Sequence, residues 1–251
     1  MRDTTAPRAG TAAAAVPALR DTAGQVPAKL DTAAEVPALR ITVEGVQAAE
    51  FAAAPTLEFA LRIAGAGGAE VRAVVLETQL RIAVTRRGYD EACRERLAGL
   101  FGPPELWGRR PASLLWAQIV TQLPAFTGET TAPLRVPCTY DFDVAAAKYL
   151  DGVRDGEIPL EFLFSGTVFS LAGGMLRATR IPWDTEAGFR MPAATWRDLM
   201  DRYFPGAAWL RLGRDTFDRL HAYRTRHALP GWDDVVESLL KAGADGRADG
   251  R

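Results

Sequence analysis

The acidic residues from Asp141 to Glu157 form the densest group of potential catalytic side chains in the chain. Within this range, Asp151 and Asp155 are each followed by a glycine. Paired carboxylates can act as general acid and base, and carboxylates beside glycine also occur in calcium-binding loops. The spacing of an EF-hand loop is missing here. We therefore interpret these residues as helix caps and turn residues, and a hydrolase that uses the carboxylates around Asp141–Glu157 stays an alternative.

Two further arrangements of residues could in principle support nucleophilic catalysis. If His221 and His227 share one helix, their side chains project about 120° apart, which does not suit a common site. The segment Ser165-Gly166-Thr167 lacks the flanking glycines and the strand-to-helix turn of a nucleophile elbow. Gly166 is instead predicted to let a neighbouring backbone approach the strand closely. No catalytic residue is assigned.

The cysteines also argue against a metal site. Cys93 and Cys138 are the two cysteines of the chain, and two cysteines cannot form a zinc site without other ligands. Each lies on an apolar face, where a free cysteine behaves as a small hydrophobic residue. The glycine-rich segment 65–68 lacks the spacing and the lysine of a phosphate-binding loop. We expect no metal and no cofactor.

One basic pair is a candidate binding site. Arg86 and Arg87 follow a predicted strand, and Tyr89 comes directly before the start of a predicted helix. Guanidinium groups near a helix N-terminus can hold a carboxylate or a phosphate. Arg86, Arg87 and Tyr89 are therefore predicted to bind an anion or a partner, against the simpler interpretation of a solvated loop with ordinary ion pairs.

The composition is that of a globular protein of the cytoplasm. The chain has 251 residues, 48% of them hydrophobic and 24% charged, with a formal net charge of −1. This balance gives no electrostatic reason to expect nucleic acid or an anionic membrane as a partner. No segment approaches the roughly 18 apolar residues that span a bilayer, and the N-terminus is a poor signal peptide.

Apolar residues alternate with polar ones in most of the chain, which predicts β-strands. The predicted strands begin near Leu39, Leu57, Val74, Ser113, Leu134, Ile158 and Met175. The strands 134–142 and 158–169 are predicted to form the middle of the fold, and the second has apolar residues on both faces, as expected of a strand covered on both sides. Asp90 and Asp143 are predicted to cap the helices that follow them.

Helical spacing of apolar residues replaces alternation after Trp183. The sequence thus predicts an α+β protein: an antiparallel β-sandwich of about seven to nine strands, with an immunoglobulin-like topology as one arrangement within that class. One helix is inserted, and C-terminal helices pack against the sandwich. We predict a disordered tail with a ten-residue repeat at 1–37, the sandwich at 38–183, the helical part of the same globule at 184–242, and a frayed end at 243–251.

Several blocks of the sequence resemble an uncharacterised actinobacterial family, a domain of unknown function. The matching blocks are RIAVTRRGY (81–89), LFG (100–102), VPCTYDFDVAAAKYL (136–150), LFSGTVF (163–169) and WRDLMDRYFP (196–205). Members of this family are associated with [NiFe]-hydrogenase gene neighbourhoods. The resemblance implies an accessory or assembly role and supplies no activity, cofactor or catalytic residue.

Taken together, these observations predict a non-catalytic cytoplasmic binding or assembly protein, with hydrogenase subunits as the implied partner. The alternatives are the hydrolase that uses the carboxylates at 141–157 and a structural subunit of a larger assembly. Self-association is left open, while nucleic acid and membrane insertion are not expected.

Overall fold

The computed structural model describes residues 39–65, 70–109, 112–141, 144–172, 174–207 and 210–248. The predicted tail at 1–37 and the predicted helix cap Asp143 lie outside these residues. None of the described helices is long and apolar enough to cross a membrane.

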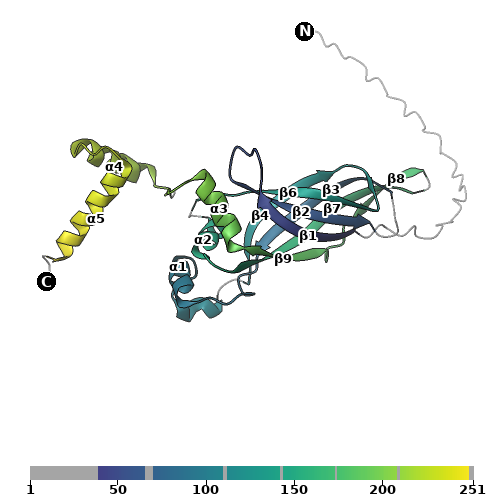
Figure 1. Cartoon of the computed structure of the whole chain (residues 1–251), viewed down its shortest axis with the longest axis horizontal. Helices are drawn as coiled ribbons and strands as arrows, with labels where there is room; N and C mark the ends of the chain where they lie inside the picture. The colour runs from purple at the N-terminus through teal and green to yellow at the C-terminus, as the bar shows by residue number, and fades with distance from the viewer. Residues whose placement is uncertain are drawn as a thin grey trace, which may run out of the picture. The chain divides into compact units, whose positions relative to one another are not determined.

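The described chain contains two antiparallel sheets (Figure 1). The first has the order β1-β2-β6, with β1 at Leu39–Ala48, β2 at Thr56–Gly65 and β6 at Glu129–Pro137. The second has the order β4-β3-β7-β8, and β5 pairs with β3 and β9 with β7. Its strands are β3 (Glu70–Ile82), β4 (Leu114–Leu123), β5 (Phe126–Thr127), β7 (Glu157–Ala172), β8 (Met175–Arg180) and β9 (Glu186–Pro192).

The chain changes sheet between β2 and β3, between β5 and β6, and between β6 and β7. Hairpins within each sheet, joined by crossings between the sheets, are the connectivity of an immunoglobulin-like sandwich. The predicted α+β class and antiparallel sandwich are therefore confirmed.

The core lies between the two sheets and follows from the alternation in the sequence. Leu57, Phe59 and Leu61 of β2 point inward and have no exposed surface. The ring of Phe59 meets that of Phe162 from the opposite sheet edge-on, with centroids 5.2 Å apart. Edge-to-face contacts of this kind stabilise a core beyond simple burial of area.

Only one of the two strands predicted to be central is central. β7 lies between β3 and the pair β8 and β9, whereas β6 is an edge strand of the smaller sheet. The prediction that β7 is covered on both faces is wrong. Phe162 and Phe164 face the core and are buried. On the outer face, Leu163 is half-buried and Ser165 is exposed. A strand in a two-layer sandwich has a single core face, so these outer residues are covered only by their neighbours in the sheet.

Helices close one end of the sandwich, where α1, α2 and α3 gather (Figure 1). They are α1 (Glu91–Phe101), followed by the 3₁₀ helix η2 (Pro104–Arg109), α2 (Ala145–Gly152) and α3 (Ala193–Tyr203). Asp90 caps α1 as predicted, because its carboxylate accepts a hydrogen bond of 2.7 Å from the backbone N–H of Cys93. Trp196 of α3 is buried and stacks on Tyr140 at 5.6 Å.

The C-terminal part of the described chain is a helical hairpin. α4 (Arg214–Arg226) and α5 (Trp232–Ala248) pack against each other. The strand β9 was not predicted, because it lies in the part of the chain after Trp183 that was predicted to be helical. α5 also continues beyond residue 242, where the frayed end was predicted.

Candidate functional site

The guanidinium groups of Arg86 and Arg87 both contact the chain around the start of β7. Nη2 of Arg86 lies 2.9 Å from a carboxylate oxygen of Glu161. Nη1 of Arg87 donates to the carbonyl of Glu157 at 3.0 Å, and Nη2 donates to that of Asp155 at 3.2 Å. Arg87 therefore fastens the loop between α2 and β7 to the loop before α1.

Tyr89 completes this cluster from the other side. Its hydroxyl shares a hydrogen bond of 2.7 Å with the hydroxyl of Tyr149 and donates to the carbonyl of Val84. The Arg87 guanidinium lies 5.4 Å from the centre of the Tyr89 ring. Burial, followed by the hydrogen bond to Tyr89, raises the pKa of Tyr149, so its phenol stays neutral. The structure thus brings Arg87 and Tyr89 into contact, whereas Arg86 pairs with Glu161. The binding of an anion or partner by Arg86, Arg87 and Tyr89 stays a prediction.

The carboxylates of the 141–157 region are spread over different environments. Asp151 is half-buried on α2, where burial is the main cause of its raised pKa. Asp155 and Glu157 are exposed in and after the turn that follows, and Glu157 lies 3.9 Å from Arg190. Asp141 lines a separate cavity of about 570 Å³.

The cysteines are buried, as predicted. Burial raises the pKa of Cys138 to about 12 and is also the main reason that the pKa of Cys93 is raised. A thiol of high pKa is a poor nucleophile and a poor metal ligand, because both roles need the thiolate. Among the described residues no three or more His, Cys, Asp or Glu side chains gather in a way that could hold a metal ion.

The histidines both lie on or beside α4 and contact aromatic rings. The His221 ring is 6.5 Å from that of Phe217 and 6.3 Å from that of Trp232. The His227 ring lies 4.2 Å from that of Tyr223. These contacts place His221 at the apolar face that α4 and α5 share.

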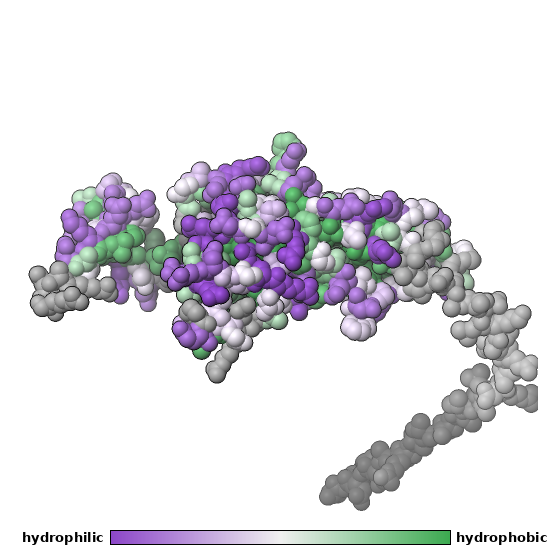
Figure 2. Space-filling view, turned by 60° about the horizontal axis from the view of Figure 1, so that its bottom comes forward, coloured by the Kyte–Doolittle hydropathy of each residue, from purple (hydrophilic) through white to green (hydrophobic). Residues whose placement is uncertain are grey.

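That shared face leaves apolar side chains of both helices exposed. α4 has no buried residue, and in α5 Val235 is buried with no exposed surface. Exposed fractions are 77% for Leu210, 39% for Phe217, 38% for Trp232 and 47% for Val236. Figure 2 shows hydrophobic residues in green on the surface of these helices.

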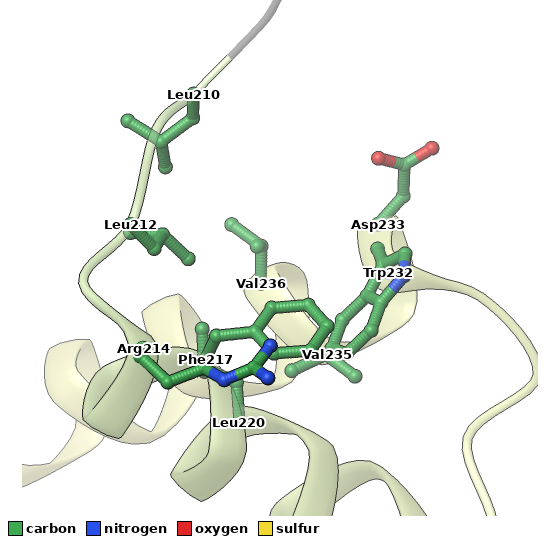
Figure 3. Close-up of a pocket in the computed structure, with 9 residues that line it drawn as sticks. All are labelled: Leu210, Leu212, Arg214, Phe217, Leu220, Trp232, Asp233, Val235 and Val236. Carbon is green, nitrogen blue, oxygen red and sulfur yellow. The ribbon is translucent and has the colours of Figure 1, made fainter.

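These side chains line a groove of about 710 Å³, here called the hairpin groove (Figure 3). Its lining residues are Leu210, Leu212, Arg214, Phe217, Leu220, Trp232, Asp233, Val235 and Val236. Leucines from the segment before α4 form one wall, and aromatic rings from both helices form the floor. Arg214 and Asp233 are the charged residues of this lining.

Polar contacts hold the two helices in this arrangement. The Tyr223 and Ser238 hydroxyls share a hydrogen bond of 2.9 Å. The backbone N–H of Gly231 donates to Asp234 at 2.8 Å, which orders the first turn of α5. The Arg224 guanidinium lies 4.7 Å from the centre of the Trp232 ring, a favourable contact of a cation with an aromatic face. The groove is therefore a preformed feature of the hairpin.

Sequence reasoning did not assign this groove. The helical spacing of its apolar residues predicted helices that pack against the sandwich. The available signal was the pairing of an apolar stripe on 217–220 with another on 232–240 across a turn that contains Pro230.

Comparisons with known proteins identify the chain by family. A family of unknown function, DUF6084, matches residues 36–248. No curated protein matches the chain.

Solved structures show distant likenesses. The CARDB domain of a Pyrococcus furiosus protein, in complex with di-metal ions, is 12% identical; the match covers 64% of this chain and 96% of that one, with a TM-score of 0.27. β-Glucosidase 3B from Thermotoga neapolitana, in complex with α-D-glucose, is 16% identical over 61% of this chain and 17% of that one, with a TM-score of 0.23.

Proposed function

The chain belongs to the DUF6084 family, whose function is unknown, and we propose that it is a non-catalytic binding or assembly protein that holds a helix of a partner protein in the hairpin groove. One observation supports this proposal above the others. Two helices expose their shared apolar face, including an aromatic floor formed by Phe217 and Trp232.

The chemistry of the groove fits protein recognition. Large exposed apolar patches rimmed by polar residues are typical of interaction sites, and tryptophan and arginine are enriched among the residues that contribute most to binding. Trp232 lines the groove, and the Arg224 guanidinium lies over its ring. An apolar groove between two helices accommodates the apolar face of a third helix.

The charges that line the groove define which helix fits. Its charged lining residues are Arg214 of α4 and Asp233 of α5, whereas Arg219 and Arg226 of α4 line a different pocket. A partner helix with leucines or aromatics on one face, an acidic residue near Arg214 and a basic residue near Asp233 is complementary to it. We therefore propose an amphipathic helix with charges of both signs beside its apolar face as the occupant.

The partner that we propose is a subunit of a [NiFe]-hydrogenase, in the cytoplasm. The support for this identity is the family resemblance described in the sequence analysis. The groove itself defines only the chemistry of the bound segment.

Affinity purification of the full chain from its native host, at native expression and with crosslinking, tests both parts. Val236→Asp places a charge in the groove at a residue that is 47% exposed, and Leu176→Asp is the control on β8, where the residue is 64% exposed. We expect hydrogenase subunits to co-purify with the wild type and with Leu176→Asp, and to be lost with Val236→Asp.

Two results would contradict the proposal. Recovery of no hydrogenase subunit with the wild type rejects the partner. Equal recovery with Val236→Asp rejects the groove as the docking surface, provided that circular dichroism shows the variant to be folded.

A further inference from the structure

β4 is an edge strand of the larger sheet, and in the described chain it pairs only with β3. Its sequence, LLWAQIVTQL, contains no charged residue, no proline and no glycine. Exposed edges present unpaired backbone N–H and C=O groups, which can pair with a strand of another chain. Natural proteins usually protect such edges with charges, prolines or bulges.

The other outer strands of the sandwich have this protection. β1 contains charges and an irregularity between Val43 and Gly45. β6 contains two prolines within its nine residues. β8 and β9 are short, with six and seven residues, and both contain arginine. Among the described outer strands of nine or ten residues, which are β1, β4 and β6, only β4 contains neither a charged residue nor a proline.

The regular part of β4 runs from Ala117 to its end. A register shift near Trp116 interrupts the pairing with β3, because Leu80 lies opposite Ala117 and Arg81 opposite Leu115. Beyond it the side chains alternate: residues 118, 120 and 122 are exposed on the outer face, and Val120 is 65% exposed. The segment 117–123 is therefore a regularly paired, uncharged edge with an apolar residue at its centre.

We propose that this edge pairs antiparallel with β4 of a second copy of the chain, on a two-fold axis at Val120. In this register Val120 lies opposite its own copy, and Gln118 lies opposite Gln122 of the second copy. Residues opposite each other in an antiparallel pair share a face, so valine meets valine and amide meets amide on the outer face.

The second copy is the occupant because the segment is self-complementary. A two-fold interface places the same patch on both chains, and a charged edge would bring like charges together at the axis. β4 has no charge to do so. The two larger sheets then continue into each other, which removes an exposed edge from each chain. A single pair of strands buries less area than a standard interface of about 1,600 Å². The dimer is therefore weak and should dissociate on dilution.

Sedimentation equilibrium of the full chain over a concentration series tests the dimer. We expect the mass to rise from 27.2 kDa to twice that value. Val120→Lys should stay monomeric at every concentration, because two lysines would meet at the axis. Leu176→Lys, a matched control that is 64% exposed on β8, should dimerise like the wild type.

Mixing complementary variants tests the register. Val120→Lys and Val120→Glu should each be monomeric alone, and their equimolar mixture should recover the dimer because position 120 meets position 120. Gln118→Lys mixed with Gln122→Glu should pair for the same reason. Circular dichroism melts confirm that each variant is folded.

Three results would overturn the inference: a wild type that is monomeric at its highest soluble concentration, a Leu176→Lys variant that dissociates as Val120→Lys does, or a mixture of the two Val120 variants that stays monomeric. The inference is independent of the proposed function, since the hairpin groove lies on other elements. Val236→Asp is therefore expected to dimerise normally.

Discussion

Gly166 of β7 lies directly against the carbonyl group of Val75 in the neighbouring strand β3. A Cβ atom at residue 166 would lie 2.0 Å from that oxygen, and the φ angle of Gly166 is +131°. Both the close approach and the positive φ require glycine. A glycine inside a predicted strand indicates such a close approach, and the structure confirms it.

Gly166→Ala should therefore destabilise the protein severely. Overpacking of this kind typically costs about 1–3 kcal/mol, and an unfavourable backbone conformation adds of order 1–3 kcal/mol. Gly188→Ala in β9 is the matched control, because a Cβ there meets nothing within 4 Å. Urea melts should show a large loss for Gly166→Ala and little change for Gly188→Ala. Similar midpoints would show that the two strands approach less closely than described.

Phe164→Ala removes a core side chain of the central strand β7 and should destabilise the protein strongly. Phe164 is 2% exposed, and its ring lies 6.3 Å from that of Phe162. Truncation of a buried phenylalanine costs about 3–5 kcal/mol, a large part of the roughly 5–15 kcal/mol that stabilises a domain. We expect little soluble protein.

Arg86→Ala is the surface comparison for Phe164→Ala. The Arg86 side chain is 65% exposed, and its ion pair is with Glu161. Exposed ion pairs contribute little, so the expected loss is about 0.5 kcal/mol. Denaturant melts compare the two variants, and equal small losses would mean that Phe164 does not lie in the core.

Arg87→Ala should cost more than Arg86→Ala, although both residues belong to the same basic pair. Arg87 donates to the carbonyls of Asp155 and Glu157, and hydrogen bonds from a charged group contribute about 1.5–3 kcal/mol each when well made. Partial exposure of Arg87 reduces the contribution of these hydrogen bonds. We therefore expect urea melts to show a free energy of unfolding that is lower by about 1–2 kcal/mol. Arg87→Lys should recover only part of it, since an ammonium group lacks the planar fork. Full recovery with lysine would show that charge alone matters.

The sequence predicted the elements whose patterns depend on local contacts. Alternation located β2 and β3, and the Asp90 cap located the start of α1. β9 was missed because its sequence, EAGFRMP, contains charges, a glycine and a proline. It is a strand because it pairs with β7, and that tertiary contact has no local signal.

The hairpin groove was missed for a different reason. The spacing of Phe217, Leu220, Trp232 and Val236 shows which helix faces are apolar. It does not show whether such a face packs on the same chain or on another protein. The exposure of these residues, read from the structure, supplies that distinction.

Cys138 gives a prediction for alkaline pH. The side chain is 8% exposed, and burial raises its pKa to about 12 from an ordinary value of 9.0. Below about pH 9 the thiol is neutral in both the folded and the unfolded chain. Above it the unfolded chain loses this proton while the folded chain keeps it. The free energy of unfolding therefore falls with rising pH, by up to about 1.4 kcal/mol per pH unit, between about pH 9 and pH 12.

Cys138→Ala removes this contribution and leaves the other groups that titrate in the same range. We expect urea melts from about pH 8 to about pH 11 to show a shallower loss of stability for the variant than for the wild type. Cys138→Ala should be less stable at neutral pH, because a buried sulfur is removed and a small cavity remains. The two curves should approach each other as the pH rises. Parallel curves across this range would mean that the Cys138 thiol ionises as readily in the folded chain as in the unfolded one, and so is not buried as described.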